Sequence, residues 1–114
     1  MITVQGRFFR DAHTGCVLLF RGINLSGLTK LPSNPDTPSY LPDLDTFYSS
    51  SPITFINRPS TLQDADDHLL RLRKYGFHLL RFLITWEAIE HQGPGIYDTE
   101  YLDFVVEYLK KAAK

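Results

Sequence analysis

The sequence contains a single cysteine, Cys16, which excludes an intrachain disulfide and a thiolate metal site. One unpaired cysteine fits a reducing compartment, so we expect an intracellular, most simply cytoplasmic, protein. The first residues, MITVQGRFFRD, lack the apolar segment of a signal peptide. No apolar run reaches the roughly 18–20 residues of a membrane span, and the sequence therefore predicts no transmembrane segment.

The sequence also lacks an excess of charge of either sign. Twelve Lys and Arg residues oppose 13 Asp and Glu residues, which gives a formal net charge of -1. No basic patch suggests nucleic acid as a partner. The glycines at 93–95 form a turn without the strand–glycine–helix spacing of a phosphate loop. We therefore expect no nucleic-acid partner and no cofactor.

The apolar pattern divides the chain into alternating blocks. Residues 2–25 read as strand, turn and strand, with the turn chemistry at 11–15 and an apolar run from Cys16. Residues 26–59 form a long loop that holds every proline except Pro94. A structureless loop of this length is uncommon in a compact domain and is usually functional or disordered.

The second half of the chain predicts two helices around a strand. Ser60 and Gln63 have capping-box spacing, and Gly76 fits a helix C-cap. Residues 78–85 read as a strand buried on both faces, and residues 86–97 as a loop. The second helix begins at about Asp98. The apolar stripes predicted for the helices are Leu62, Ala65, Leu69 and Leu72, then Tyr101, Leu102, Val105, Val106, Leu109 and Ala112.

This order predicts an α/β fold. Strands that alternate with helices form parallel βαβ units, and two such units leave strand edges without partners. We expect residues 1–114 to be the N-terminal part of a (β/α)8 barrel, namely a β-hairpin followed by the first two β/α units. A whole barrel of this kind usually takes about 250 residues.

Several polar clusters have a structural explanation that competes with a chemical one. Asp64 and His68, with Asp66 and Asp67 between them, have the residue types of metal ligands. A solvated helix face with acids near the N-terminus explains them better. Glu87 and Glu90 resemble a glycosidase pair, but such carboxylates flank one bond from opposite sides. Two glutamates in one short segment approach from the same side.

The isolated histidines and the cysteine carry weaker signals. His13 lies in the predicted turn and His91 in the predicted loop, and spacing identifies no serine or cysteine partner for either. Cys16 begins an apolar run, so packing explains it better than a nucleophilic role. We assign no catalytic residue among these three.

Asn24 and Arg81 are the two stronger candidates. Asn24 ends the segment FRGIN at the carboxyl end of a predicted strand, where the active sites of barrels lie. Period-two alternation places Arg81 on one face of its strand and Phe82 on the other, apolar face. Arg81 would then point into the barrel. Spacing alone leaves a structural ion pair as the slightly better explanation of this arginine.

Three segments resemble glycoside hydrolase family 5. They are LFRGINLSG, RPSTLQDADDHLLRLRKYGFHLLRF and TWEAIEHQGPGIYDTEYLDFVVEYL, which together span nearly all of the chain. The pattern GF-x-LLRF-x-x-TWEAIEH-x-GPG-x-YD is specific. The likeness is to the fungal endoglycoceramidase-related branch, which includes glucosylceramidases and steryl-β-glucosidases.

The resemblance implies a TIM barrel, a retaining mechanism with two glutamates, and a glycolipid substrate such as glucosylceramide or a steryl glucoside. It also implies that Arg81 supports the active site by hydrogen bonding to the nucleophilic glutamate, and that Asn24 lies near the sugar. The family's catalytic glutamates follow later strands, so no residue of this chain is assigned either role. The chain alone is then inactive. The alternative is a non-catalytic fragment that binds a lipid or a protein.

The long loop would lie on the active-site face of such a barrel. Its aromatic residues either line the route of a ceramide or sterol group, with peripheral membrane contact, or pack beneath the loop. They are Tyr40, Phe47, Tyr48 and Phe55.

Overall fold

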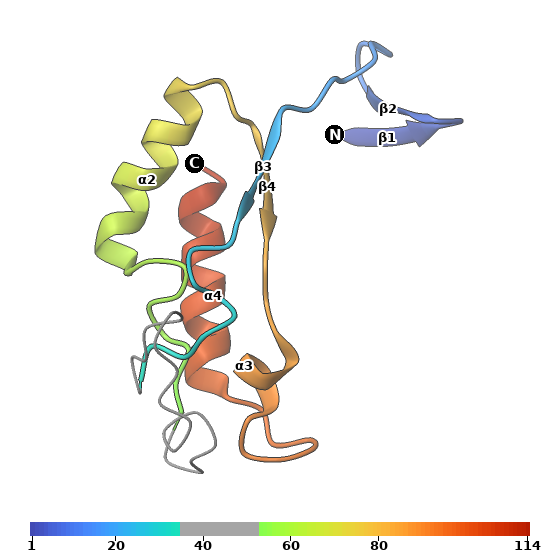
Figure 1. Ribbon diagram of the computed structural model, residues 1–114. Helices are drawn as coiled ribbons and strands as arrows, with labels where there is room; N and C mark the ends of the chain where they lie inside the picture. Colours follow the sequence, from blue (N-terminus) through green and yellow to red (C-terminus); the bar gives the residue numbers. More distant parts are fainter. Residues whose placement is uncertain (35–52) are drawn as a thin grey trace.

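The computed structural model describes residues 1–34 and 53–114, and Figure 1 shows their arrangement. A two-stranded hairpin stands apart from an α/β unit, in which two long helices lie beside a pair of parallel strands. The elements in chain order are β1 (Ile2–Gln5), β2 (Phe8–Asp11), β3 (Gly22–Leu25), α2 (Leu62–Lys74), β4 (Leu79–Phe82), α3 (Trp86–Glu90) and α4 (Thr99–Ala112).

The predicted N-terminal hairpin is present, but its turn was misplaced. Strands β1 and β2 are antiparallel and reverse direction at Gly6, whose φ of 60° suits glycine. The predicted turn at 11–15 is a second turn, in which the Asp11 carboxylate accepts hydrogen bonds from the amides of His13 and Thr14. The apolar run after it contacts the hairpin through the bridge of Arg10 with Val17 and through the rings of Phe9 and Phe20, and it becomes a regular strand only at Gly22.

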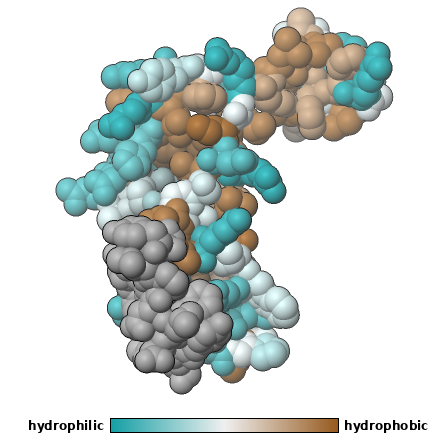
Figure 2. Space-filling model, viewed as in Figure 1, coloured by the Kyte–Doolittle hydropathy of each residue, from teal (hydrophilic) through white to brown (hydrophobic). Residues whose placement is uncertain are grey.

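The hairpin exposes much of its apolar surface. Figure 2 shows this region as a mainly hydrophobic end of the molecule. Val4 is 69% exposed and Phe9 is 50% exposed, so the hairpin does not bury a core of its own.

Strands β3 and β4 form the predicted parallel pair, connected through α2. Gly22 lies opposite Leu79, and Leu25 lies opposite Phe82. This connection confirms the βαβ interpretation. The strand predicted over 78–85 is shorter than expected and is not buried on both faces: Leu79 is 47% exposed, because no described element covers that face.

Helix α2 begins one residue later than the capping pattern suggested. The N-cap is Thr61, whose hydroxyl oxygen accepts the amide of Asp64 at 3.1 Å. Ser60 instead hydrogen-bonds with Tyr108. The helix ends as predicted at Gly76, with φ of 78° and the amide bonds of a Schellman motif.

The turn from α2 to β4 is tied to the segment before β3. The amides of His78 and Leu79 donate to the Arg21 carbonyl at 3.0 and 3.2 Å. The His78 ring lies between these segments, with Nε2 3.2 Å from the Arg21 amide nitrogen and Nδ1 3.3 Å from the Gly76 carbonyl oxygen. Nε2 also lies 3.0 Å from the Leu19 carbonyl oxygen, so the ring contacts the segment before β3 at two backbone groups.

Two predictions for the C-terminal half need correction. The loop expected over 86–97 contains the short helix α3. The N-cap of this helix is Thr85, whose hydroxyl oxygen accepts a hydrogen bond from the Ala88 amide. Helix α4 begins after its N-cap Asp98, as predicted, but its buried face includes Phe104, while Val106 and Leu109 are 48% and 46% exposed. The side chains that α4 buries are Tyr101, Phe104, Val105 and Tyr108.

The core lies between α2, α3, α4 and the helix-facing side of β3 and β4. The ring of Phe82 on β4 packs against Tyr108 on α4, with centroids 5.4 Å apart. Phe55, from the end of the long loop, is fully buried against Tyr101. For Phe55, packing is therefore the correct alternative; Tyr40, Phe47 and Tyr48 lie outside the described residues. No helix in the described ranges is long and apolar enough to span a membrane.

Candidate functional site

The structure places Asn24 directly beside Arg81. The two residues are register partners in the parallel pair, so their side chains lie on the same face of the sheet. Leu25 and Phe82, the next residue on each strand, pack against the core. The face carrying Asn24 and Arg81 is thus the one that turns away from the helices, as the sequence predicted for Arg81.

These two residues line a depression of about 490 Å³ at the carboxyl end of the strands. The strands contribute every second residue to it, which is the pattern expected of one sheet face. The turn after β3 supplies the rest of the wall. The lining residues are Asn24, Ser26, Leu28, Thr29, Lys30, Leu31, Arg81 and Leu83.

Arg81 is exposed, and within residues 1–34 and 53–114 no hydrogen bond or ion pair joins it to another residue. Within these ranges it is not a member of a buried structural ion pair, which was the alternative that spacing favoured. Arg81 and Lys30 are the charged groups among the lining residues, and neither faces a carboxylate there. The depression is therefore suited to a carboxylate or another group rich in hydrogen-bond acceptors.

Sequence reasoning missed Thr29 and Lys30. Both follow β3 in a tight turn, where the Leu31 amide donates to the Leu28 carbonyl at 2.9 Å. Leu28 has a φ of 59°, an uncommon left-handed conformation for a branched side chain. Gly27 lies so close to Pro59 that an added Cβ would fall 2.6 Å from the proline Cβ. This contact holds the turn against the segment before α2.

Two of the other acidic candidates, Asp64 and Asp66, have structural partners. The Thr61 hydroxyl donates to Asp64 at 2.7 Å, which completes the helix cap. Asp66 on α2 pairs with Lys111 on α4. Asp67 and His68 are exposed, and the described ranges contain no grouping of acidic, histidine and cysteine side chains able to hold a metal ion.

Glu87 and Glu90 both lie on the short helix α3. The Trp86 indole donates to the Glu90 carboxylate one turn away, while Glu87 is exposed. Two carboxylates on one five-residue helix cannot flank a bond from opposite sides. The view that neither is a catalytic glutamate agrees with this placement.

His13, His91 and Cys16 lie apart from the Asn24–Arg81 depression. His91 is largely buried, with its Nδ1 3.9 Å from Asp98 Oδ2. His13 is exposed in the turn after β2. Cys16 is also exposed, so the expectation that it packs in an apolar environment is wrong.

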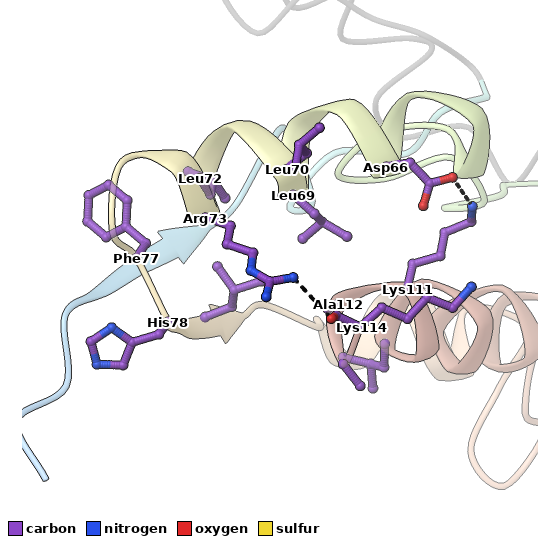
Figure 3. Close-up of a pocket in the computed structure, with 13 residues that line it drawn as sticks. Asp66, Leu69, Leu70, Leu72, Arg73, Phe77, His78, Lys111, Ala112 and Lys114 are labelled. Carbon is purple, nitrogen blue, oxygen red and sulfur yellow. Dashed lines mark hydrogen bonds and ion pairs between the residues drawn. The ribbon is translucent and has the colours of Figure 1, made fainter.

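A second cavity, of about 590 Å³, lies between α2 and α4 (Figure 3). Arg73 donates to the Lys114 carbonyl at 3.2 Å, and Asp66 pairs with Lys111, so the polar groups at its edges join the two helices. Its walls are mainly aliphatic and include Leu80 from the opposite face of β4 to Arg81. It is a groove between packed helices, without the convergent polar groups of a binding site.

The chain resembles known proteins over nearly its whole length. It is 45% identical to a glucosylceramidase from Aspergillus fumigatus over 111 residues and 38% identical to an ergosteryl-β-glucosidase from Saccharomyces cerevisiae over 112 residues. These alignments cover 97% and 96% of the chain, but 14% of each relative. No family model matches the sequence.

A solved structure agrees with the sequence relatives. The crystal structure of sterylglucosidase 1 from Cryptococcus neoformans with tris superposes with a TM-score of 0.86 at 39% identity. The superposition covers 98% of the chain and 16% of the sterylglucosidase. The chain is thus homologous to a part of the fungal glucosylceramidases and steryl-β-glucosidases, as its sequence motifs predicted.

Proposed function

We propose that this chain forms the first two β/α units of a (β/α)8 barrel in a family 5 glycoside hydrolase that cleaves β-glucosides of lipids. The substrate class is glucosylceramide or steryl glucoside, and the enzyme acts inside the cell. The observation that carries the proposal is the exposed Arg81 guanidinium beside Asn24 at the carboxyl end of the parallel strands. The names of the homologous proteins support the same chemistry.

In this proposal the two catalytic glutamates come from parts of the enzyme outside these 114 residues. One protonates the leaving lipid alcohol, and the other attacks the sugar to form a covalent glycosyl intermediate that water hydrolyses. Arg81 positions the nucleophile. Its planar fork donates hydrogen bonds to that carboxylate and favours the ionised form that attacks.

Asn24 serves as the sugar-side neighbour of Arg81. Its amide both donates and accepts hydrogen bonds, as recognition of sugar hydroxyls requires. The leucines of the same depression, Leu28, Leu31 and Leu83, give it an apolar side. A polar wall next to an apolar one suits a ligand with a sugar head and a lipid tail, so the enzyme would contact the membrane surface that supplies it.

A chimera tests this function. The 114-residue chain would replace the matching segment of the Cryptococcus sterylglucosidase, and turnover of a steryl glucoside would be measured. Arg81→Lys should lower kcat about 10- to 100-fold with little change in KM, because a charge-assisted hydrogen bond to the nucleophile is lost. The acid limb of the pH–rate profile should move to higher pH.

The matched control is Arg71→Lys, since Arg71 is exposed on α2 and lies outside the depression. It should leave kcat unchanged. An Arg81→Lys chimera that loses thermal stability but keeps kcat and its acid limb would remove Arg81 from the active site.

The isolated chain should not hydrolyse glucosides. Purified protein would be incubated with a chromogenic β-glucoside and compared with buffer. Turnover that disappears in a Glu87→Gln, Glu90→Gln double variant would show that the catalytic pair lies on α3 after all, contrary to the proposal.

A further inference from the structure

Thr29 is the buried polar side chain of the Asn24–Arg81 depression. It is 1% exposed, and its hydroxyl has no hydrogen-bond partner in the described chain. Other threonine hydroxyls are occupied: Thr61 and Thr85 cap helices through theirs. The unpaired hydroxyl of Thr29 therefore sits in the wall of a depression that already contains Arg81.

The backbone holds Thr29 in this place. The turn after β3 is fixed by the left-handed Leu28 and by the close contact of Gly27 with Pro59. Neither feature depends on the Thr29 hydroxyl. A hydroxyl that is buried without a partner lowers stability, and nothing in the turn compensates for it.

We propose that Thr29 is a specificity-determining residue whose hydroxyl binds a hydroxyl group of the sugar ring. This inference rests on the proposed function and adds a residue to the same site. Thr29 lines the depression with its hydroxyl buried, so binding requires a change of the χ1 rotamer that exposes Oγ1 to the ligand. The threonine hydroxyl then donates one hydrogen bond and accepts another.

A sugar fits this group better than an anion does. An anion only accepts hydrogen bonds, and Arg81 and Lys30 already offer donors in the depression. The hydroxyl of Thr29 and the amide of Asn24 offer acceptors as well. A polyol both donates and accepts hydrogen bonds, so it can bind Lys30, Asn24 and Thr29 while Arg81 holds the nucleophilic carboxylate.

The experiment compares Thr29→Val, which removes only the hydroxyl, with Thr29→Ser, which keeps it. Saturation-transfer difference NMR would titrate methyl β-D-glucopyranoside against the full 114-residue chain. We expect Thr29→Val to weaken binding about three- to tenfold, as loss of one neutral hydrogen bond does, and Thr29→Ser to stay within about twofold of the parent.

Stability provides a second readout that a structural role would change. Urea unfolding, followed by the fluorescence of the single tryptophan, should show that Thr29→Val has an unchanged or higher midpoint. Thr61→Val is the matched control, and its midpoint should fall because its hydroxyl caps α2. An equal fall for Thr29→Val would mean that its hydroxyl has a structural partner, and the inference would fail.

The remaining outcomes separate the two proposals. If the parent chain and Thr29→Val bind the glucoside equally, the role of Thr29 is refuted while the proposed function stands. If the parent chain binds inorganic phosphate, measured by ³¹P line width, and not the glucoside, both are refuted. If the parent chain gives no glucoside signal, the role of Thr29 is refuted as well.

Discussion

The Ser60 hydroxyl and the Tyr108 hydroxyl lie 3.0 Å apart, and their hydrogen bond joins the segment before α2 to the middle of α4. Tyr101, two turns earlier on α4, is also fully buried, but its hydroxyl has no partner in the described chain. The same residue type thus occurs twice on one buried helix face with opposite hydrogen-bonding states.

Tyr108→Phe should therefore destabilise the fold, and Tyr101→Phe should not. Loss of the Ser60 bond should cost about 0.5–1.5 kcal/mol, whereas removal of an unpaired buried hydroxyl should be neutral or stabilising. The free energy of unfolding from urea titrations measures both. A larger loss for Tyr101→Phe than for Tyr108→Phe would contradict the assignment of partners.

Tyr101 should also make the fold sensitive to alkali. Burial, and then the negative charge of Asp98, raise the pKa of its phenol. The unfolded chain therefore releases this proton at lower pH than the folded one. The stability that depends on the neutral phenol is present below the ordinary tyrosine pKa of about 10 and is lost as pH rises beyond it. Unfolding midpoints measured from pH 8 to 11 should fall less steeply in Tyr101→Phe than in the parent.

Gly27→Ala should disturb the turn that carries Thr29 and Lys30. The added Cβ would meet the Cβ and the carbonyl oxygen of Pro59 at 2.6 Å, so the backbone must move, at a cost of about 1–3 kcal/mol. Gly15→Ala is the comparison, because its Cβ would meet no atom within 4 Å and only its left-handed φ is penalised. Amide chemical shifts should change at Thr29 and Arg81 in Gly27→Ala and stay unchanged there in Gly15→Ala.

Thr85→Ala should weaken α3, the helix that follows β4. The Thr85 hydroxyl accepts the Ala88 amide at 3.2 Å, and loss of such a cap costs about 0.5–2 kcal/mol. Thr99 begins α4 inside its first turn, where Asp98 is the cap, so Thr99→Ala should cost much less. Amide hydrogen exchange at Ala88 should accelerate in the first variant alone. Equal exchange in both variants would show that the hydroxyl does not hold α3.

Alternation along the strands made the site predictable in part. Period two assigns Arg81 and Phe82 to opposite faces, and a parallel connection brings the carboxyl ends of two strands together. Asn24 and Arg81 could be paired from these rules. It could not be predicted that the described residues place no carboxylate in the depression beside Arg81, because this depends on which segments cover that face of the sheet.

The same rules could not predict that Thr29 and Lys30 line the depression. Their position depends on the conformation of the tight turn after β3, and a turn has no hydrophobic periodicity from which to predict it. The available signal was local: a glycine within three residues of a hydroxyl and a cation, directly after a strand. The contact of Gly27 with Pro59, which fixes the turn, joins residues 32 positions apart in the sequence.

The helices, too, were predictable from the sequence only in part. The apolar stripe of α2 was correct, since its aliphatic residues recur regularly. On α4, apolar residues lie on several sides, and the choice between Leu109 and Tyr108 is made by Phe82 packing across from β4. Helix α3 has only five residues, too few for a periodic signal, although Thr85 was a visible cap.

The turn between α2 and β4 sets the register of β4 against β3, and so the residues that line the depression at the far end of the sheet. Its amides at His78 and Leu79 hold the strand start against the Arg21 carbonyl, and that anchoring sets Arg81 opposite Asn24. Insertion or deletion of one residue in this turn would bring Leu80 or Phe82 beside Asn24 and send the guanidinium towards the core. The number of residues in a turn that the ligand never touches therefore determines which side chain lies beside Asn24 in the depression.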